Sequence, residues 1–145
     1  SQRMRLDVSV NMLTYQALKF KKIKVFGGKQ FRPSIHIQDL TNLFKFFINK
    51  KVSSGCYNAG FENISIMQIA KEIKKNIPCK IKIYKSNDLR SYRLDSSKII
   101  KLGFKPKFNV EYAIKELINI YKNKKFRAKD INYTVKWMLK KKIIA

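Results

Sequence analysis

The spacing of apolar residues changes repeatedly along this chain, from the interval of a helix to that of a strand and back. Between Asp7 and Lys19, apolar residues recur at positions i, i+3, i+7 and i+8, which places them on one helix face. In Ile23–Phe26 and again in Lys80–Tyr84 they alternate with lysine, which is typical of a half-buried strand. Helices and strands therefore alternate, and this order predicts an α/β or mixed α+β fold.

Signals at helix ends locate the other elements. Ser65 and Gln68 have the spacing of a capping box, in which two side chains satisfy backbone amides that a helix start leaves free. The helix that follows ends at Pro78, and Asn109 predicts the start of another helix that reaches Tyr121. The remaining predicted elements are strands at Ser34–Ile37 and Gly55–Ala59, a helix that begins near Asp39, and a short helix at Ser96–Leu102.

The length of 145 residues predicts one domain, which we assign to residues 1–125, followed by a basic, helical tail at residues 126–145. The apolar content of 45% is too high for a disordered chain. No apolar run approaches the ~20 residues of a membrane helix, so we expect no membrane contact. Cys56 and Cys79 lack metal-ligand spacing and are predicted to be reduced and buried, which fits a cytoplasmic protein.

The net charge of +24 is large enough to attract any polyanion. Lysine greatly outnumbers arginine, however, and arginine is the residue that binds phosphates bidentately and reads bases. The lysines are spread along the chain, mostly opposite apolar helix positions. The charge therefore favours a solvated lysine-rich surface and makes nucleic acid an unlikely partner. A stand-alone basic module that binds nucleic acid or another polyanion is the alternative hypothesis.

Residue types that would carry catalysis are missing from the expected contexts. The paired glycines Gly27 and Gly28 follow a predicted strand but lead into a second strand, so they do not form a dinucleotide loop before a helix. His36 is the single histidine, and a lone histidine on a strand is more often structural than catalytic. We therefore assign no catalytic, cofactor-binding or metal-binding residue in this sequence.

Two places carry groups that suit a nucleotide diphosphate. Arg32 precedes Pro33, which stiffens the backbone and favours a fixed guanidinium for bidentate phosphate contact. The segment Tyr84–Arg93 gathers basic groups that can hold phosphates, a carboxylate that can accept from ribose hydroxyls, and a tyrosine that can stack. The candidates in this segment are Lys85, Asp88, Arg90, Tyr92 and Arg93.

Several phrases in a fixed order carry a family resemblance. They are VFGGKQFRPSIHIQDL (Val25–Leu40), GCYNAGFENISIMQIA (Gly55–Ala70), SNDLRSYRLDSSKIIKLGFKP (Ser86–Pro106) and VEYAIKEL (Val110–Leu117). Together they resemble the C-terminal half of NAD-dependent epimerases and dehydratases, the extended short-chain dehydrogenases that act on nucleotide sugars. The resemblance implies an α/β fragment that holds the last Rossmann strand and helix plus a small substrate-binding subdomain.

The resemblance also assigns roles. Arg32 matches an arginine that contacts the substrate phosphates, whereas His36 and Asp39 match positions that shape the strand-to-helix junction. The loop after residue 84 matches one that grips the nucleotide, and the opening segment matches one near the sugar and diphosphate. The implied substrate-binding residues are Arg32, Asp88, Arg90, Lys85, Tyr92, Asp7 and Asn11.

The family's glycine-rich loop and catalytic Tyr-x-x-x-Lys pair have no assigned counterpart here. The resemblance implies that NAD is bound mainly by an N-terminal half outside this sequence, and that the full-length enzyme is a homodimer acting on a nucleoside diphosphate-sugar. The present chain is then expected to be inactive alone, with the apolar faces of Asp7–Lys19 and Leu40–Ile48 lacking partners. A degenerate remnant that binds nothing specific is a third hypothesis.

Overall fold

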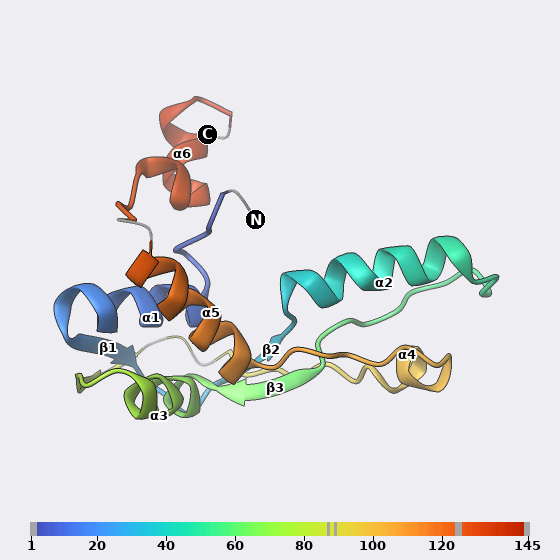
Figure 1. The fold of residues 1–145 in the computed structure, drawn as a ribbon, viewed down its shortest axis with the longest axis horizontal. Coiled ribbons are helices and arrows are strands. Elements are labelled where there is room, and N and C mark those ends of the chain that lie inside the picture. The colour runs from blue at the N-terminus through green and yellow to red at the C-terminus, as the bar shows by residue number, and fades with distance from the viewer. Residues whose placement is uncertain (1–2, 87, 89, 124–125, 144–145) are drawn as a thin grey trace.

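The computed structural model describes residues 3–86, 88, 90–123 and 126–143, and shows helices alternating with short strands (Figure 1). This order confirms the predicted mixed α/β class. The strands are β1 (Lys22–Phe26), β2 (Phe31–Ser34), β3 (Glu62–Ser65) and β4 (Lys80–Tyr84). The helices are α1 (Ser9–Phe20), α2 (Ile37–Asn49), α3 (Ile66–Asn76), α4 (Ser97–Lys101), α5 (Val110–Asn123), the 3-10 turn η1 (Asp130–Asn132) and α6 (Thr134–Lys140).

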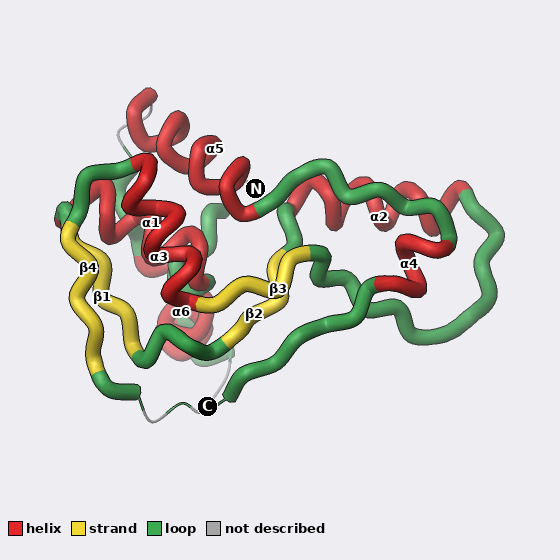
Figure 2. The backbone as a smooth tube through the Cα atoms, turned by 90° about the horizontal axis from the view of Figure 1, so that it is seen from below, coloured by secondary structure: helices red, strands yellow, loops and turns green. Residues whose placement is uncertain are grey.

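The strands form two separate pairs (Figure 2). Strands β1 and β4 run parallel, with Ile23 opposite Ile81, and β2 and β3 run antiparallel, with Arg32 opposite Ile64. Helix α3 follows β3 directly and leads into β4, which joins the two pairs. The antiparallel pair, whose strand β2 contains Arg32, lies between the β1–β4 pair and the long helix α2 (Figures 1 and 2).

The main core lies where α1, α3 and α5 pack together and against the β1–β4 pair. Each of these helices presents an apolar face, and burial of such a side chain contributes roughly 1.5–3 kcal/mol. The buried residues of this core are Leu13, Ala17, Ile23, Val25, Ile69, Ala70, Ile73, Ile77, Val110 and Ile114. The prediction that the α1 face lacks a partner is therefore wrong, because α3 and α5 cover it.

A second, smaller core lies between α2, α4 and the segments that flank them. Leu43, Ile99 and Phe104 are buried there, and Phe46 and Phe61 pack against Phe104 at ring-centroid distances of 5.6 and 5.4 Å. The molecule is elongated because this core sits apart from the first, with the β2–β3 pair between them (Figure 2).

The outer face of α2 remains uncovered, as the sequence predicts. Phe44 is 64% exposed and Ile48 is 81% exposed, and Ile37 at the start of the helix is also exposed. These residues lie at helical spacing, so they share one face. An apolar face of this kind marks a place where another surface is expected to pack.

Two predicted strands differ from the structure. The strand predicted at Ser34–Ile37 lies earlier, at Phe31–Ser34, because Ile37 already begins α2. The predicted strand at Gly55–Ala59 does not form, and this segment makes no ladder with any other strand in the described part of the chain. Strand geometry depends on a hydrogen-bonded neighbour, and neither strand pair reaches this segment.

The predicted helix caps are present. The Ser65 hydroxyl accepts from the Gln68 amide at 3.2 Å, and the Gln68 side chain accepts from the Ser65 amide at 2.9 Å. Asn109 Oδ1 accepts from the Tyr112 amide at 2.8 Å at the start of α5. These caps fix where α3 and α5 begin, and with them the walls of the space between α5 and β2.

Two further expectations concern exposure. None of the described helices is long and apolar enough to cross a membrane. Cys56 and Cys79 are both free thiols, but neither is buried as predicted. Cys56 is exposed because it lies in the unpaired segment before β3, and Cys79 is only partly buried.

Candidate functional site

An open cleft of about 730 Å³ lies between the N-terminal segment, β2 with the start of α2, and one face of α5. Of the predicted ligand residues, Asp7, Asn11, Arg32 and Tyr92 line it. Pockets of about 300–1,000 Å³ are the usual size for small-molecule sites. The sequence therefore predicted residues from three separate segments that the fold brings to one place.

Arg32 is a largely buried cation that lines the cleft. It extends from β2 with only 19% of its side chain exposed. Its Nη1 donates to the Phe31 carbonyl at 2.8 Å and to the Arg90 carbonyl at 2.5 Å, and its guanidinium lies 4.9 Å from the centre of the Tyr92 ring. Stacking and backbone contacts fix the planar group, which suits bidentate contact with a phosphate.

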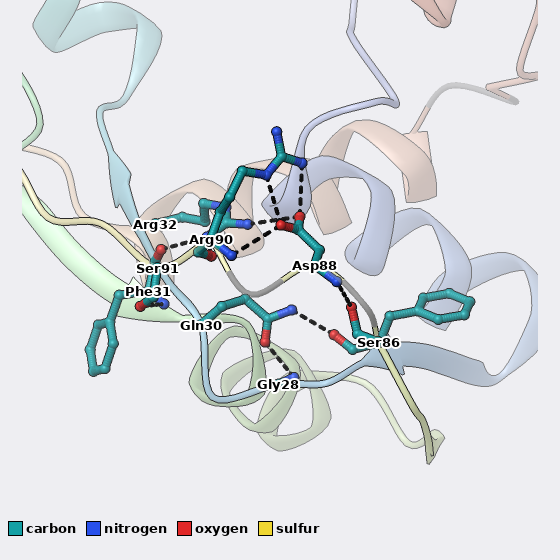
Figure 3. A network of polar contacts seen from close by, with 9 residues as sticks. Gly28, Gln30, Phe31, Arg32, Ser86, Asp88, Arg90 and Ser91 are labelled. Atoms are coloured by element: carbon teal, nitrogen blue, oxygen red, sulfur yellow. Dashed lines mark hydrogen bonds and ion pairs between the residues drawn. The ribbon is translucent and has the colours of Figure 1, made fainter.

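Asp88 joins Arg32 to Arg90 (Figure 3). Its carboxylate accepts from Arg32 Nη2 at 3.3 Å, and from Arg90 Nε at 2.7 Å and Nη2 at 2.9 Å. The side-chain hydrogen bond from Arg90, followed by the bond from the Arg90 amide, lowers the pKa of Asp88 to about 2. The carboxylate is thus ionised at neutral pH and holds two guanidinium groups beside each other.

The loop that carries Asp88 is tied to the neighbouring turns (Figure 3). Ser91 Oγ accepts from the Phe31 amide at 3.0 Å, and Ser86 Oγ accepts from the Asp88 amide at 3.1 Å. Gln30 bridges the turn before β2, accepting from the Gly28 amide at 2.5 Å and donating to the Phe26 carbonyl at 2.6 Å. Gly28 has a φ of +106°, which favours glycine at this turn.

Other predicted residues of this loop lie farther out. Lys85 is exposed after β4 and is not one of the residues that line the cleft. Arg93 packs over the Phe31 ring at 4.0 Å from its centre, away from the residues that line the cleft. The fold thus groups Arg32, Asp88, Arg90 and Tyr92 and leaves Lys85 outside this group. Within the group, Arg32 and Tyr92 line the cleft, whereas Asp88 and Arg90 do not line it and are joined to it through Arg32.

The N-terminal wall of the cleft contains Asp7 and Asn11. Asp7 accepts from Arg5 Nε at 2.8 Å and from the Thr134 amide at 2.8 Å, and mainly because of the Arg5 contact its pKa is lowered to about 2. Asn11 donates to the Arg5 carbonyl at 2.8 Å. Both predicted residues therefore hold Arg5, a cleft residue that the sequence reasoning missed because the segment has no motif of its own.

His36 and Glu116 form the opposite end of the cleft. His36 Nδ1 accepts from the Gln38 amide at 3.2 Å, which caps α2, and Nε2 lies 3.0 Å from Glu116 Oε2. The imidazole also packs against Phe108 at 4.9 Å and Tyr112 at 5.6 Å between ring centres. These contacts agree with an architectural role for His36. Asp39 is likewise architectural, because it is buried and accepts from the amides of Lys107 and Phe108 at 2.9–3.1 Å.

Tyr15 and Lys19 also have Tyr-x-x-x-Lys spacing on α1, which the sequence reasoning passed over. Tyr15 is only 7% exposed, and its ring packs against Tyr121 at 5.6 Å. Lys19 lies over the same ring at 5.7 Å. This pair belongs to the packing of α1 and α5. In the part of the chain that the structure describes, no group of three His, Cys, Asp or Glu side chains could hold a metal ion.

No protein-family model matches the sequence. The structure, however, is similar to solved structures of nucleotide-sugar enzymes. It matches the Helicobacter pylori ADP-L-glycero-D-manno-heptose-6-epimerase with a TM-score of 0.65 and 24% identity, over 76% of this chain and 36% of that one. It matches a Bacillus cereus UDP-glucuronic acid 4-epimerase, in complex with NAD and a UDP-sugar, with a TM-score of 0.70 and 22% identity, over 83% of this chain and 41% of that one.

A dTDP-glucose 4,6-dehydratase from Bacillus anthracis, in complex with NAD, also matches with a TM-score of 0.70 and 19% identity, over 83% of this chain and 40% of that one. The chain spans well under half the length of each of these enzymes. It therefore has the fold of part of an extended short-chain epimerase or dehydratase.

Proposed function

We propose that this chain is the substrate-binding portion of an NAD-dependent nucleotide-sugar epimerase or dehydratase. It corresponds to the C-terminal half, with the last Rossmann strand and helix followed by a small substrate-binding subdomain. The observation that carries the proposal is the convergence of Arg32 and Arg90 on one carboxylate beside a cleft. The fold match supports it, because similar enzymes bind nucleotide sugars in their solved structures.

The site residues have distinct roles in this proposal. Arg32 holds the diphosphate through its fixed guanidinium, and Arg90 adds a second positive charge. Asp88 orients both groups and, when a nucleotide is bound, accepts from ribose hydroxyls. Tyr92 stacks beneath the Arg32 guanidinium and borders the nucleotide. Asp7 and Asn11 face the sugar end, and Lys85 approaches from outside to attract the phosphates.

The proposal assigns the chemistry to the portion of these enzymes that this chain does not span. That portion would hold NAD, which would supply the reversible oxidation of a sugar carbon that epimerisation and dehydration need. The present residues bind and orient the nucleotide sugar. The complete protein is proposed to be a cytoplasmic homodimer, and the present chain is proposed to be inactive alone.

The net charge of +24 favours one alternative, a module that binds nucleic acid or another polyanion. The two hypotheses predict different responses to salt. Binding to DNA through many lysines releases the salt cations that were condensed on the DNA phosphates. A higher salt concentration opposes this release, so the affinity falls steeply as salt rises. Binding of a nucleotide sugar in a cleft involves few phosphates and depends less on salt.

Calorimetry of the purified chain tests the proposal. UDP-glucose, GDP-mannose, ADP-glucose, dTDP-glucose, inorganic pyrophosphate and a double-stranded DNA are titrated at two salt concentrations. We expect saturable binding of at least one nucleotide sugar that Arg32→Ala weakens at least tenfold, since a charge-assisted bidentate contact is lost. Arg127→Ala removes an exposed arginine outside the cleft and serves as the matched control. Tight, salt-sensitive DNA binding with no response to any nucleotide sugar would overturn the proposal.

A further inference from the structure

The N-terminal wall of the cleft has no secondary structure of its own before α1. Within the described chain, residues 4–7 precede the first helix and carry Arg5 and Asp7 into the cleft. Leu6 is nevertheless fully buried. A segment without ladder or helix hydrogen bonds keeps a defined path only if another element satisfies its backbone groups.

The C-terminal turn η1 supplies those contacts. The Leu6 amide donates to the Asn132 carbonyl at 2.7 Å, and Asn132 Nδ2 donates to the Met4 carbonyl at 2.7 Å. Asn132 Oδ1 meanwhile accepts from the Lys129 amide at 2.7 Å, which closes the turn. Asn132 is only 6% exposed, so one buried side chain fixes both its own turn and the distant segment.

Thr134 continues the contact into the cleft. Its amide donates to Asp7 Oδ2 at 2.8 Å, and Asp7 Oδ1 accepts from Arg5 Nε at 2.8 Å. The Thr134 hydroxyl accepts from Arg3 Nη2 at 3.1 Å, and the Arg3 guanidinium lies 5.8 Å from the centre of the Trp137 ring. The orientation of the arginines on this wall thus depends on residues more than 120 positions later in the sequence.

We propose that residues 129–134 are a clasp that positions the N-terminal wall of the cleft for the sugar end of the ligand, with Asn132 as the positioning residue. The proposal rests on the proposed function, because it concerns the same cleft. Arg32, which binds the diphosphate together with Arg90 in the proposed function, lines the other wall, and among the described residues neither arginine is hydrogen-bonded to residues 129–134. The clasp therefore governs recognition beyond the phosphates, whereas phosphate binding is independent of it.

The difference between a small and a large ligand tests this. Inorganic pyrophosphate is small enough to contact the wall that carries Arg32 without reaching the N-terminal wall. A nucleotide sugar that fills a cleft of about 730 Å³ contacts both walls. Asn132→Asp keeps the oxygen that accepts from Lys129 but replaces the donor to Met4 by a second oxygen. We expect the dissociation constant of the best-binding nucleotide sugar to rise about tenfold, since a buried hydrogen bond becomes a repulsive contact. The constant for pyrophosphate should stay within about twofold, because distant sites act independently.

Asp130→Asn is the matched control, because Asp130 lies in the same turn as Asn132. It removes the ion pairs of Asp130 with Lys136 and Lys140 on α6 and changes no contact of residues 3–7 given above. It should leave both constants unchanged. Amide hydrogen exchange gives a direct readout, in which Asn132→Asp accelerates exchange at Leu6 and Asp130→Asn does not. Unchanged nucleotide-sugar binding despite a faster Leu6 exchange would overturn the clasp, as would an equal loss for both ligands.

Should Asn132→Asp fail to fold, Thr134→Val decides, because it removes only the hydroxyl that holds Arg3. The expected result is weaker nucleotide-sugar binding by about threefold with pyrophosphate unaffected, and no change would overturn the clasp. Failure of the wild-type chain to bind any nucleotide sugar would instead contradict the proposed function. Binding by the wild type with no effect of these variants would contradict the clasp alone.

Discussion

At the scale of single residues, Asp88 decides how the cationic wall is arranged. The carboxylate lies between two guanidinium groups, so one negative charge keeps two positive charges close together at the edge of the cleft. Without it, the like charges of Arg32 and Arg90 would repel each other. Under the proposed function, the two negative charges of a diphosphate bind to this pair of groups.

The titration of Asp88 provides a direct check of this arrangement. Its pKa of about 2 lies below its ordinary value of 3.8, so its contribution to stability is present above pH 3.8 and is lost as the pH falls towards 2. In Arg90→Gln we expect the midpoint to move back towards 3.8, because the main hydrogen-bond donor is gone. The carboxyl ¹³C shift of Asp88 measured against pH gives both midpoints. An ordinary midpoint in the wild type would contradict the ion-pair arrangement.

Only some of the residues in and beside the cleft could be predicted from the sequence. Arg32, Asp88 and Arg90 are recognisable from their neighbours and from the family resemblance. Arg5 and Glu116 are not, because Arg5 is held in the cleft by Asp7, which in turn accepts from the distant Thr134 amide, and Glu116 lies on a helix face that looks solvated. Long-range contacts of this kind leave no local spacing to detect.

At the scale of elements, the start of α3 supports the cleft from behind. The first helical amides have no partners within the helix. The Ile66 amide donates to the Gln30 carbonyl at 3.2 Å, and the Met67 amide donates to the Gly28 carbonyl at 2.9 Å. The helix start thus holds the turn from which β2 carries Arg32, and the Ser65–Gln68 capping box holds the helix start.

Removing this cap should destabilise the element and the turn together. Ser65→Ala removes an acceptor at a buried N-cap, and we expect the free energy of unfolding to fall by about 1 kcal/mol. Urea denaturation followed by circular dichroism measures the change. Ser54→Ala, at an exposed position outside the helices, is the control and should have no effect. Equal stability of Ser65→Ala and wild type would show that the cap contributes nothing.

The elements also show where periodicity succeeds and fails. The capping box and Asn109 located α3 and α5 correctly, because the signal for a helix start lies within a few residues of it. The strand predicted at Gly55–Ala59 failed, because a strand also needs a neighbour, and this chain offers that segment none. Local patterns therefore located the helix starts and also β1 and β4, which pair with each other, but they could not show that residues 55–59 find no strand to pair with.

At the scale of the whole molecule, the elongated shape leaves one side of the smaller core open. Helix α2 buries Leu43 on one face and exposes Ile37, Phe44 and Ile48 on the other. The helix lies at one end of the molecule (Figure 1). The unpaired segment before β3 belongs to the same half of the molecule. Both features agree with a chain that spans about 40% of the length of the enzymes it matches.

The last prediction concerns the exposed face of α2. Phe44→Lys/Ile48→Lys replaces two apolar side chains on the uncovered face with charges, and neither residue belongs to the buried cluster. We expect the isolated chain to bind less of the hydrophobic dye ANS and to aggregate less, because the exposed apolar patch is replaced by charged side chains. The circular dichroism should stay unchanged. Val135→Lys changes a single exposed residue on α6 and should leave dye binding as it is. Dye binding that stays constant in the double variant would mean that this face is not the apolar surface to which the dye, or a partner, binds.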